Sequence, residues 1–71
     1  MVWVLERNND VLKCEIRQVA NSSDYEFEVA SRRGPELMRF GSATELINGY
    51  LRRQMALEAQ GWRPRYTLSE I

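Results

Sequence analysis

The chain contains no histidine and a single cysteine, Cys14. Histidine is the commonest ligand in transition-metal sites and the commonest general base, so its absence argues against zinc sites and histidine-dependent catalysis. One cysteine cannot form an intrachain disulfide. The sequence also carries no glycine-rich phosphate loop and no metal-ligand spacing. We therefore expect neither an enzyme nor a protein with a bound metal or cofactor.

Long apolar runs are also absent. The apolar stretch Met1–Leu5 is followed at once by Glu6 and Arg7. It is far shorter than a signal-peptide core or the roughly 20 residues that span a bilayer. We therefore expect no membrane contact and a cytoplasmic protein.

The chain has no excess of either charge, because ten Lys or Arg residues balance ten Asp or Glu residues. Such a chain has no overall field that attracts nucleic acid or an acidic membrane, so binding to a polyanion would need a local patch. With 71 residues, the chain has room for one modest core. A chain of this size buries only about 60% of the surface that its unfolded form exposes, which favours self-association.

A helix with both ends specified is the clearest element in the sequence. Ser42 and Glu45 have the S-x-x-E spacing of a capping box at its start. Gly61 tolerates the left-handed conformation that often ends a helix. Trp62 then falls where the apolar residue of a Schellman motif contacts Leu57. The sequence predicts a continuous helix between these two signals.

The residues before this helix alternate between apolar and polar side chains, and turn-forming clusters interrupt them at short intervals. Asn, Asp, Ser and Gly in these clusters bond to their own backbone or tolerate positive φ. Both features are typical of an antiparallel meander. The expected elements are strands over about residues 2–7, 11–20, 25–31 and 36–40 and a helix over about residues 43–60.

These elements predict an α+β fold in two layers (ββββα). A four-stranded antiparallel β-meander is packed on one face by a single C-terminal α-helix. One domain is expected over residues 1–65, and residues 66–71 are expected to form a C-terminal tail, for which order and disorder both stay open. Either face of the first strand could point toward the helix, and we favour the face that carries Trp3.

Loop lengths set the expected register of the other two hairpins, because a shift by one residue would reverse every side chain. We expect four-residue loops at 21–24 and 32–35. They would place Ile16 opposite Val29 on the inner face. On the outer face, Glu28 would lie between two arginines, and each such pair contributes about 0.2–1 kcal/mol.

The expected helix presents one apolar stripe to the sheet in its first turns, at 100° per residue. The members of this stripe are Ala43, Leu46, Ile47, Tyr50 and Leu51. Polar residues occupy the centre of the stripe further along, so we expect the last turns to overhang the sheet. Gly49 falls on the polar side, where nothing in the sequence accounts for a residue that costs about 1 kcal/mol relative to alanine.

Cys14 and the pair Glu26 and Glu28 could take part in catalysis or metal binding, but each is explained more simply by a structural role. Cys14 lies between Leu12 and Ile16 on the inner face, so we expect a buried thiol and not a nucleophile. Glu26 and Glu28 share one strand face and could act as acid and base or bind a hard cation. Carboxylates neutralised by arginine are more common on a solvated sheet face.

The outer sheet face and the end of the helix are the features that indicate a function. The outer face mixes aliphatic residues with its charges, and exposed aliphatic patches usually mark protein contacts. A second copy is the simplest partner for a small domain. We therefore predict a non-catalytic protein-interaction domain, homodimeric through the outer sheet face and the C-terminal part of the helix, with another protein as an alternative partner. The candidate contact residues are Val19, Leu37, Met55, Leu57, Trp62, Arg63 and Arg65.

The alternative function is a module that binds single-stranded nucleic acid. Arginines and aromatic residues interleave near the C-terminus, and such modules combine a basic groove with rings on which bases stack. The same residue types are enriched at protein interfaces, so the sequence leaves both functions open. The candidate residues for nucleic-acid binding are Arg52, Arg53, Trp62, Arg63 and Arg65.

Overall fold

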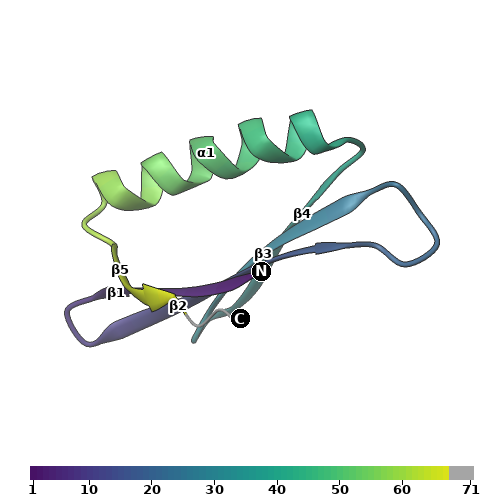
Figure 1. Ribbon diagram of the computed structural model, residues 1–71. Coiled ribbons are helices and arrows are strands. Elements are labelled where there is room, and N and C mark those ends of the chain that lie inside the picture. The colour runs from purple at the N-terminus through teal and green to yellow at the C-terminus, as the bar shows by residue number, and fades with distance from the viewer. Residues whose placement is uncertain (68–71) are drawn as a thin grey trace.

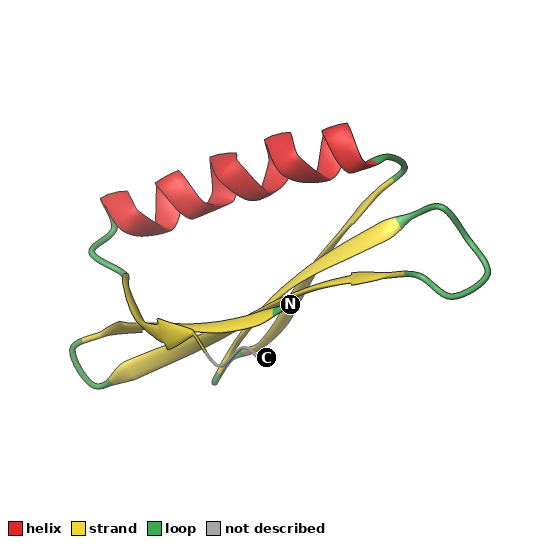
Figure 2. Cartoon of the chain, viewed as in Figure 1, coloured by secondary structure: helices red, strands yellow, loops and turns green. Residues whose placement is uncertain are grey.

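The computed structural model describes residues 1–67 as a five-stranded antiparallel sheet with one helix across one face (Figures 1 and 2). The elements are β1 (Val2–Arg7), β2 (Asp10–Gln18), β3 (Tyr25–Ser31), β4 (Gly34–Phe40), α1 (Ala43–Ala59) and β5 (Arg63–Thr67). Their order across the sheet is β4-β3-β2-β1-β5. The predicted α+β fold, a meander of four strands with one helix on one face, is confirmed.

The fifth strand is the element that the sequence did not predict. β5 runs antiparallel to β1, with Glu6 opposite Arg63. Pro64 lacks a backbone N–H, which an edge strand tolerates because one side of that strand needs no partner. Residues 66–67 of the expected tail therefore belong to the sheet, and the remaining residues, 68–71, lie outside the described part of the chain.

The two predicted hairpin registers are wrong by two residues, although each side chain lies on its predicted face. The β2–β3 loop covers residues 19–24, and the β3–β4 loop covers only residues 32–33. Gly34, with a φ of 113°, permits the tighter of these turns. Ile16 therefore pairs with Phe27. A shift by two residues preserves the faces because side chains alternate with a period of two.

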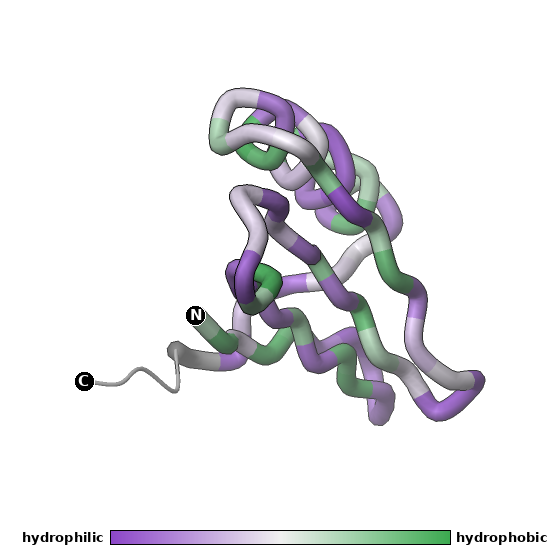
Figure 3. Tube along the Cα trace, turned by 90° about the vertical axis from the view of Figure 1, so that its right-hand side faces the viewer, coloured by the Kyte–Doolittle hydropathy of each residue, from purple (hydrophilic) through white to green (hydrophobic). Residues whose placement is uncertain are grey.

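The core fills the space between the sheet and α1, on the face that contains Trp3. The indole of Trp3 stacks on Phe27, with ring centroids 5.9 Å apart. Tyr50 of α1 meets these two rings edge-on, at 5.5 and 5.7 Å. The predicted inward direction of Trp3 is thus confirmed, and hydrophobic and hydrophilic residues alternate along the strands (Figure 3). The buried core residues are Leu5, Leu12, Cys14, Phe27, Val29, Leu46, Leu57 and Trp62.

The predicted helix start is confirmed. The Oγ of Ser42 accepts a hydrogen bond from the backbone N–H of Glu45 at 3.2 Å. The Glu45 carboxylate reaches back one residue beyond the N-cap and accepts from the N–H of Gly41 at 3.1 Å. The first bond satisfies a donor that the first turn of a helix leaves unpaired, and the second fixes the residue before the N-cap against that turn.

The predicted helix stop is also confirmed, as a Schellman motif. The N–H of Trp62 donates to the carbonyl of Leu57 at 3.1 Å, and the N–H of Gly61 donates to that of Glu58 at 3.0 Å. Gly61 has a φ of 97°, as this motif requires. Leu57 and Trp62 are 2% and 6% exposed, so the predicted overhang is wrong and the last turns are part of the core.

The helix is rotated about its axis relative to the prediction. Leu46 faces the core as expected, but Ile47 and Leu51 are 54% and 48% exposed. Gly49 permits this rotation, because a Cβ added there would lie 2.5 Å from Cε1 of Phe40. The glycine lets the helix backbone approach this ring directly. Close packing therefore explains the glycine at position 49, and α1 is oriented with Gly49 facing the Phe40 ring. The predicted stripe residues that are exposed are Ala43, Ile47 and Leu51.

Candidate interaction surfaces

Among residues 1–67, the helix covers one face of the sheet and no second layer lies on the outer face (Figure 2). Val11 and Leu37 on this face are 50% and 53% exposed. The predicted contact residue Val19 lies in the β2–β3 loop and is partly buried. The aliphatic residues of the outer face are Val2, Val4, Val11, Ala30 and Leu37.

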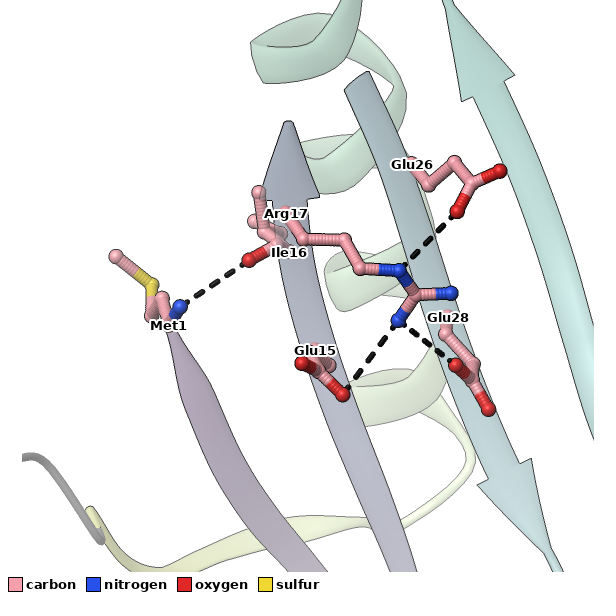
Figure 4. Close-up of polar contacts among 6 residues, drawn as sticks. All are labelled: Met1, Glu15, Ile16, Arg17, Glu26 and Glu28. Carbon is pink, nitrogen blue, oxygen red and sulfur yellow. Dashed lines mark hydrogen bonds and ion pairs between the residues drawn. The ribbon is translucent and has the colours of Figure 1, made fainter. Parts of the chain in front are cut away.

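A charged cluster occupies the centre of the outer face (Figure 4). Arg17 donates from Nη1 to Glu28 at 2.9 Å and from Nε to Glu26 at 3.1 Å. Glu15 lies 3.5 Å from the same Nη1. The hydrogen bond to Glu28, aided by the bond to Glu26, raises the pKa of the Arg17 guanidinium. Three carboxylates against one guanidinium leave a formal excess of two negative charges.

This cluster confirms one of the two predicted arginine partners of Glu28, Arg17, corrects the other, and divides the aliphatic residues. Glu26, and not Glu28, lies between arginines on both neighbouring strands. Glu28 instead lies between Glu15 and Leu37, and Val2 lies on the far side of Glu15. Two glutamates therefore separate Val2 from Leu37, so the outer face is not one continuous apolar patch.

A continuous apolar row lies on α1 instead. Ile47, Leu51 and Met55 are 54%, 48% and 68% exposed. Side chains four residues apart on a helix lie above one another, so these three form one row, here named the helix stripe. The rotation that Gly49 permits turns this row away from the core. Met55, a predicted contact residue, is thus accessible as part of the helix stripe.

Two other predicted contact residues are in the core. Leu57 and Trp62 are almost completely buried, and they seal the end of the helix against the sheet. The Arg7 guanidinium lies over the Trp62 ring, 4.6 Å from its centroid. Leu57 and Trp62 are only 2% and 6% exposed, so neither can anchor a protein contact, and Trp62 offers no free ring on which a base could stack because Arg7 lies over it.

The arginines that the sequence grouped near the C-terminus are placed in different surroundings. Arg53 and Arg65 each form an ion pair with a glutamate, at 2.9 and 3.6 Å. Arg63 donates to two backbone carbonyls at the end of the helix, at 3.1 and 3.0 Å. Arg52 is exposed on α1. Nucleic-acid binding by these arginines stays a prediction, but the ring of Trp62, on which the bases were expected to stack, is not accessible for stacking.

The structure assembles a groove that the sequence did not reveal. Its volume is about 600 Å³, and it lies between the last turns of α1 and the strand ends around the β3–β4 hairpin. Four arginines line it, and we name it the arginine groove. The sequence offered no local signal because these residues come from β1, the β3–β4 loop and α1. The arginines of the groove are Arg7, Arg32, Arg33 and Arg53.

Within residues 1–67, no helix is long and apolar enough to cross a membrane. The same residues contain no group of three or more His, Cys, Asp or Glu side chains placed to hold a metal ion. No protein-family model, curated protein or solved structure matches the chain. The surfaces of the described residues are therefore the basis for assigning a function.

Proposed function

We propose that this chain is a non-catalytic protein-interaction domain that forms a homodimer through the helix stripe. The observation that carries this proposal is the exposure of Ile47, Leu51 and Met55 in one row. Removing apolar surface from water contributes about 25 cal/mol per Å², so three half-exposed large side chains favour association. Contiguous exposed apolar surface of this kind usually marks a protein contact.

A two-fold axis gives the stripe a complementary partner. If the axis passes beside Leu51 and the two helices run antiparallel, Leu51 meets its own copy. Ile47 then meets Met55 of the second copy, so every member of the row is covered. Helices packed in this way lie about 8–10 Å apart, which the side chains of the stripe can fill.

The charges of the outer sheet face favour the helix stripe over that face. Two copies related by a two-fold axis through the outer face would bring the cluster around Arg17 close to its own copy. Each cluster has an excess of two negative charges, and like charges across an interface oppose association. The outer-face dimer that the sequence predicted remains the second arrangement to be tested.

Light scattering after size-exclusion chromatography tests both arrangements with one pair of variants. Leu51→Glu and Leu37→Glu make the same change at two sites of similar exposure, 48% and 53%. We expect wild type and Leu37→Glu to have twice the 8.4 kDa chain mass at micromolar concentration. Leu51→Glu should be monomeric, with an unchanged circular dichroism spectrum because its side chain lies outside the core.

Two results would overturn the proposal. One is a wild-type chain that stays monomeric up to the highest concentration at which it is soluble. The other is a dimer that Leu37→Glu dissociates and Leu51→Glu leaves intact, which would assign the interface to the outer sheet face.

A further inference from the structure

The arginine groove has the volume of a site for a small molecule. Its volume of about 600 Å³ is within the range of ligand pockets, about 300–1,000 Å³. The last turns of α1 form one wall, and the β3–β4 hairpin with the start of β2 forms the other. None of the helix-stripe residues lines the groove, so a dimer through that stripe would leave it open.

The groove carries an excess of positive charge. Asp10 accepts a hydrogen bond from Arg32 at 2.7 Å, and Glu36 accepts one from Arg53 at 2.9 Å. Four guanidinium groups against these two carboxylates leave an excess of two positive charges. The ion pair of Arg32 is largely exposed, at 80% and 50% for its two side chains, and such pairs exchange readily for a better partner.

Two of the guanidinium groups have unused donors. Arg53, whose side chain is 29% exposed, donates from Nη2 to Glu36, and its Nη1 has no acceptor within residues 1–67. Arg33 is exposed in the β3–β4 loop, and its guanidinium has no ion pair or hydrogen bond within residues 1–67. A guanidinium has five N–H donors in a planar fork that matches the oxygens of phosphate or carboxylate. The groove therefore presents donors for an oxyanion from both of its walls.

The floor of the groove is apolar, in contrast to its rim. Val29 comes from the sheet, and Leu57 and Trp62 come from the end of the helix. All three are buried members of the core. A ligand that fits both parts therefore carries an anionic group at the rim and an apolar body toward the floor.

We propose that the arginine groove binds a phosphate monoester with an apolar or aromatic body. A phosphate monoester carries about −1.5 to −2 charges at pH 7 and three acceptor oxygens, which match the two excess positive charges and the unused donors. The phosphate lies between Arg33 and Arg53, and the body lies toward Leu57 and Trp62.

Titration of the ¹⁵N-labelled chain with phenyl phosphate tests this proposal by chemical-shift changes. We expect the changes to concentrate at the groove residues. Arg33→Gln should weaken binding about tenfold, as for the loss of one charge-assisted contact. Arg52→Gln removes the same charge from an exposed site outside the groove and should bind as wild type does. Benzoate, with one charge, and inorganic phosphate, with no apolar body, should each bind more weakly than phenyl phosphate.

Several results would overturn this proposal. Equal weakening by Arg33→Gln and Arg52→Gln would show a response to net charge alone. Inorganic phosphate that binds as tightly as phenyl phosphate would remove any role for the apolar floor. The absence of shift changes at the groove would exclude the site. If Arg33→Gln unfolds the chain, Arg32→Gln replaces it as the groove variant, with the same expected weakening. Leu51→Glu should keep its affinity for phenyl phosphate, which separates this result from that of the proposed dimer.

Discussion

Replacing Gly49 by alanine sets two opposing effects against each other. In a helix interior, alanine is favoured over glycine by about 1 kcal/mol. At this position, however, the added Cβ would lie 2.5 Å from Cε1 of Phe40, closer than the 3.0 Å that real Cβ contacts essentially never go below. Phe40 is partly buried and packs against the core, so moving its ring would disrupt existing contacts.

The magnitudes decide the sign of the effect. Forcing an extra methyl group into a packed site costs about 1–3 kcal/mol. The contact involves the edge of a rigid ring, so we expect the upper part of that range. After the helix preference is subtracted, Gly49→Ala should lower the free energy of unfolding by about 1–2 kcal/mol.

Urea denaturation, followed by the fluorescence of Trp3 and Trp62, measures this change. The protein concentration has to be the same for all variants, because a dimer couples stability to concentration. An unchanged m-value would show that the mutation acts on stability and not on the unfolded surface.

The same mutation in a Phe40→Leu background tests whether contact with Phe40 causes the loss of stability. Phe40→Leu removes the ring edge, so Gly49→Ala in that background should raise stability by about 1 kcal/mol, the ordinary helix preference. The expected sign of the Gly49→Ala effect is therefore opposite in the two backgrounds. A stabilising effect in the wild-type chain, or the same effect in both backgrounds, would show that contact with Phe40 is not the reason for the glycine.

Two other expectations concern single residues. Gly61→Ala should lower the free energy of unfolding by about 1–2 kcal/mol in the same urea experiment, because the φ of 97° is unfavourable for a residue with a Cβ. The added Cβ meets nothing closer than 3.5 Å, so the loss reports the backbone conformation and not a clash. An unchanged free energy of unfolding would contradict the Schellman assignment. Burial raises the pKa of the Cys14 thiol from 9.0 to about 11, so a thiol reagent at pH 8 should label the protein only after unfolding. As pH rises, the thiol ionises at a lower pH in the unfolded chain than in the folded protein. The contribution of Cys14 to the free energy of unfolding is therefore fully present below pH 9.0 and is lost as pH rises to about 11. The Cys14→Ala variant should show no such loss.

Local sequence signals determined the helix with both of its ends and the existence of the first four strands. The two caps of α1 were predictable because each depends on residues within a few positions of one another, such as Ser42 with Glu45 and Leu57 with Trp62. The alternation of side chains placed four strands and the correct faces of β2, β3 and β4, because the period of two is intrinsic to extended backbone, but it left both faces of β1 open. The burial of Cys14 followed from that alternation alone.

Tertiary packing decided the register, the rotation of the helix and the fifth strand. A shift by two residues leaves every face unchanged, so the apolar pattern could not distinguish the observed pairing of Ile16 from the predicted one. The direction of the helix stripe depends on the contact between Gly49 and Phe40, which joins α1 to β4. β5 forms because the turn at Gly61 returns the chain to the free edge of β1.

The sequence by itself determined that this chain is a small α+β domain with a helix of defined length over a sheet meander. It could not determine which surfaces the fold presents. The arginine groove joins residues from both ends and the middle of the chain, and the helix stripe is exposed in an orientation of α1 that the contact between Gly49 and Phe40 permits. Both depend on long-range contacts between side chains, which neither periodicity nor local spacing encodes.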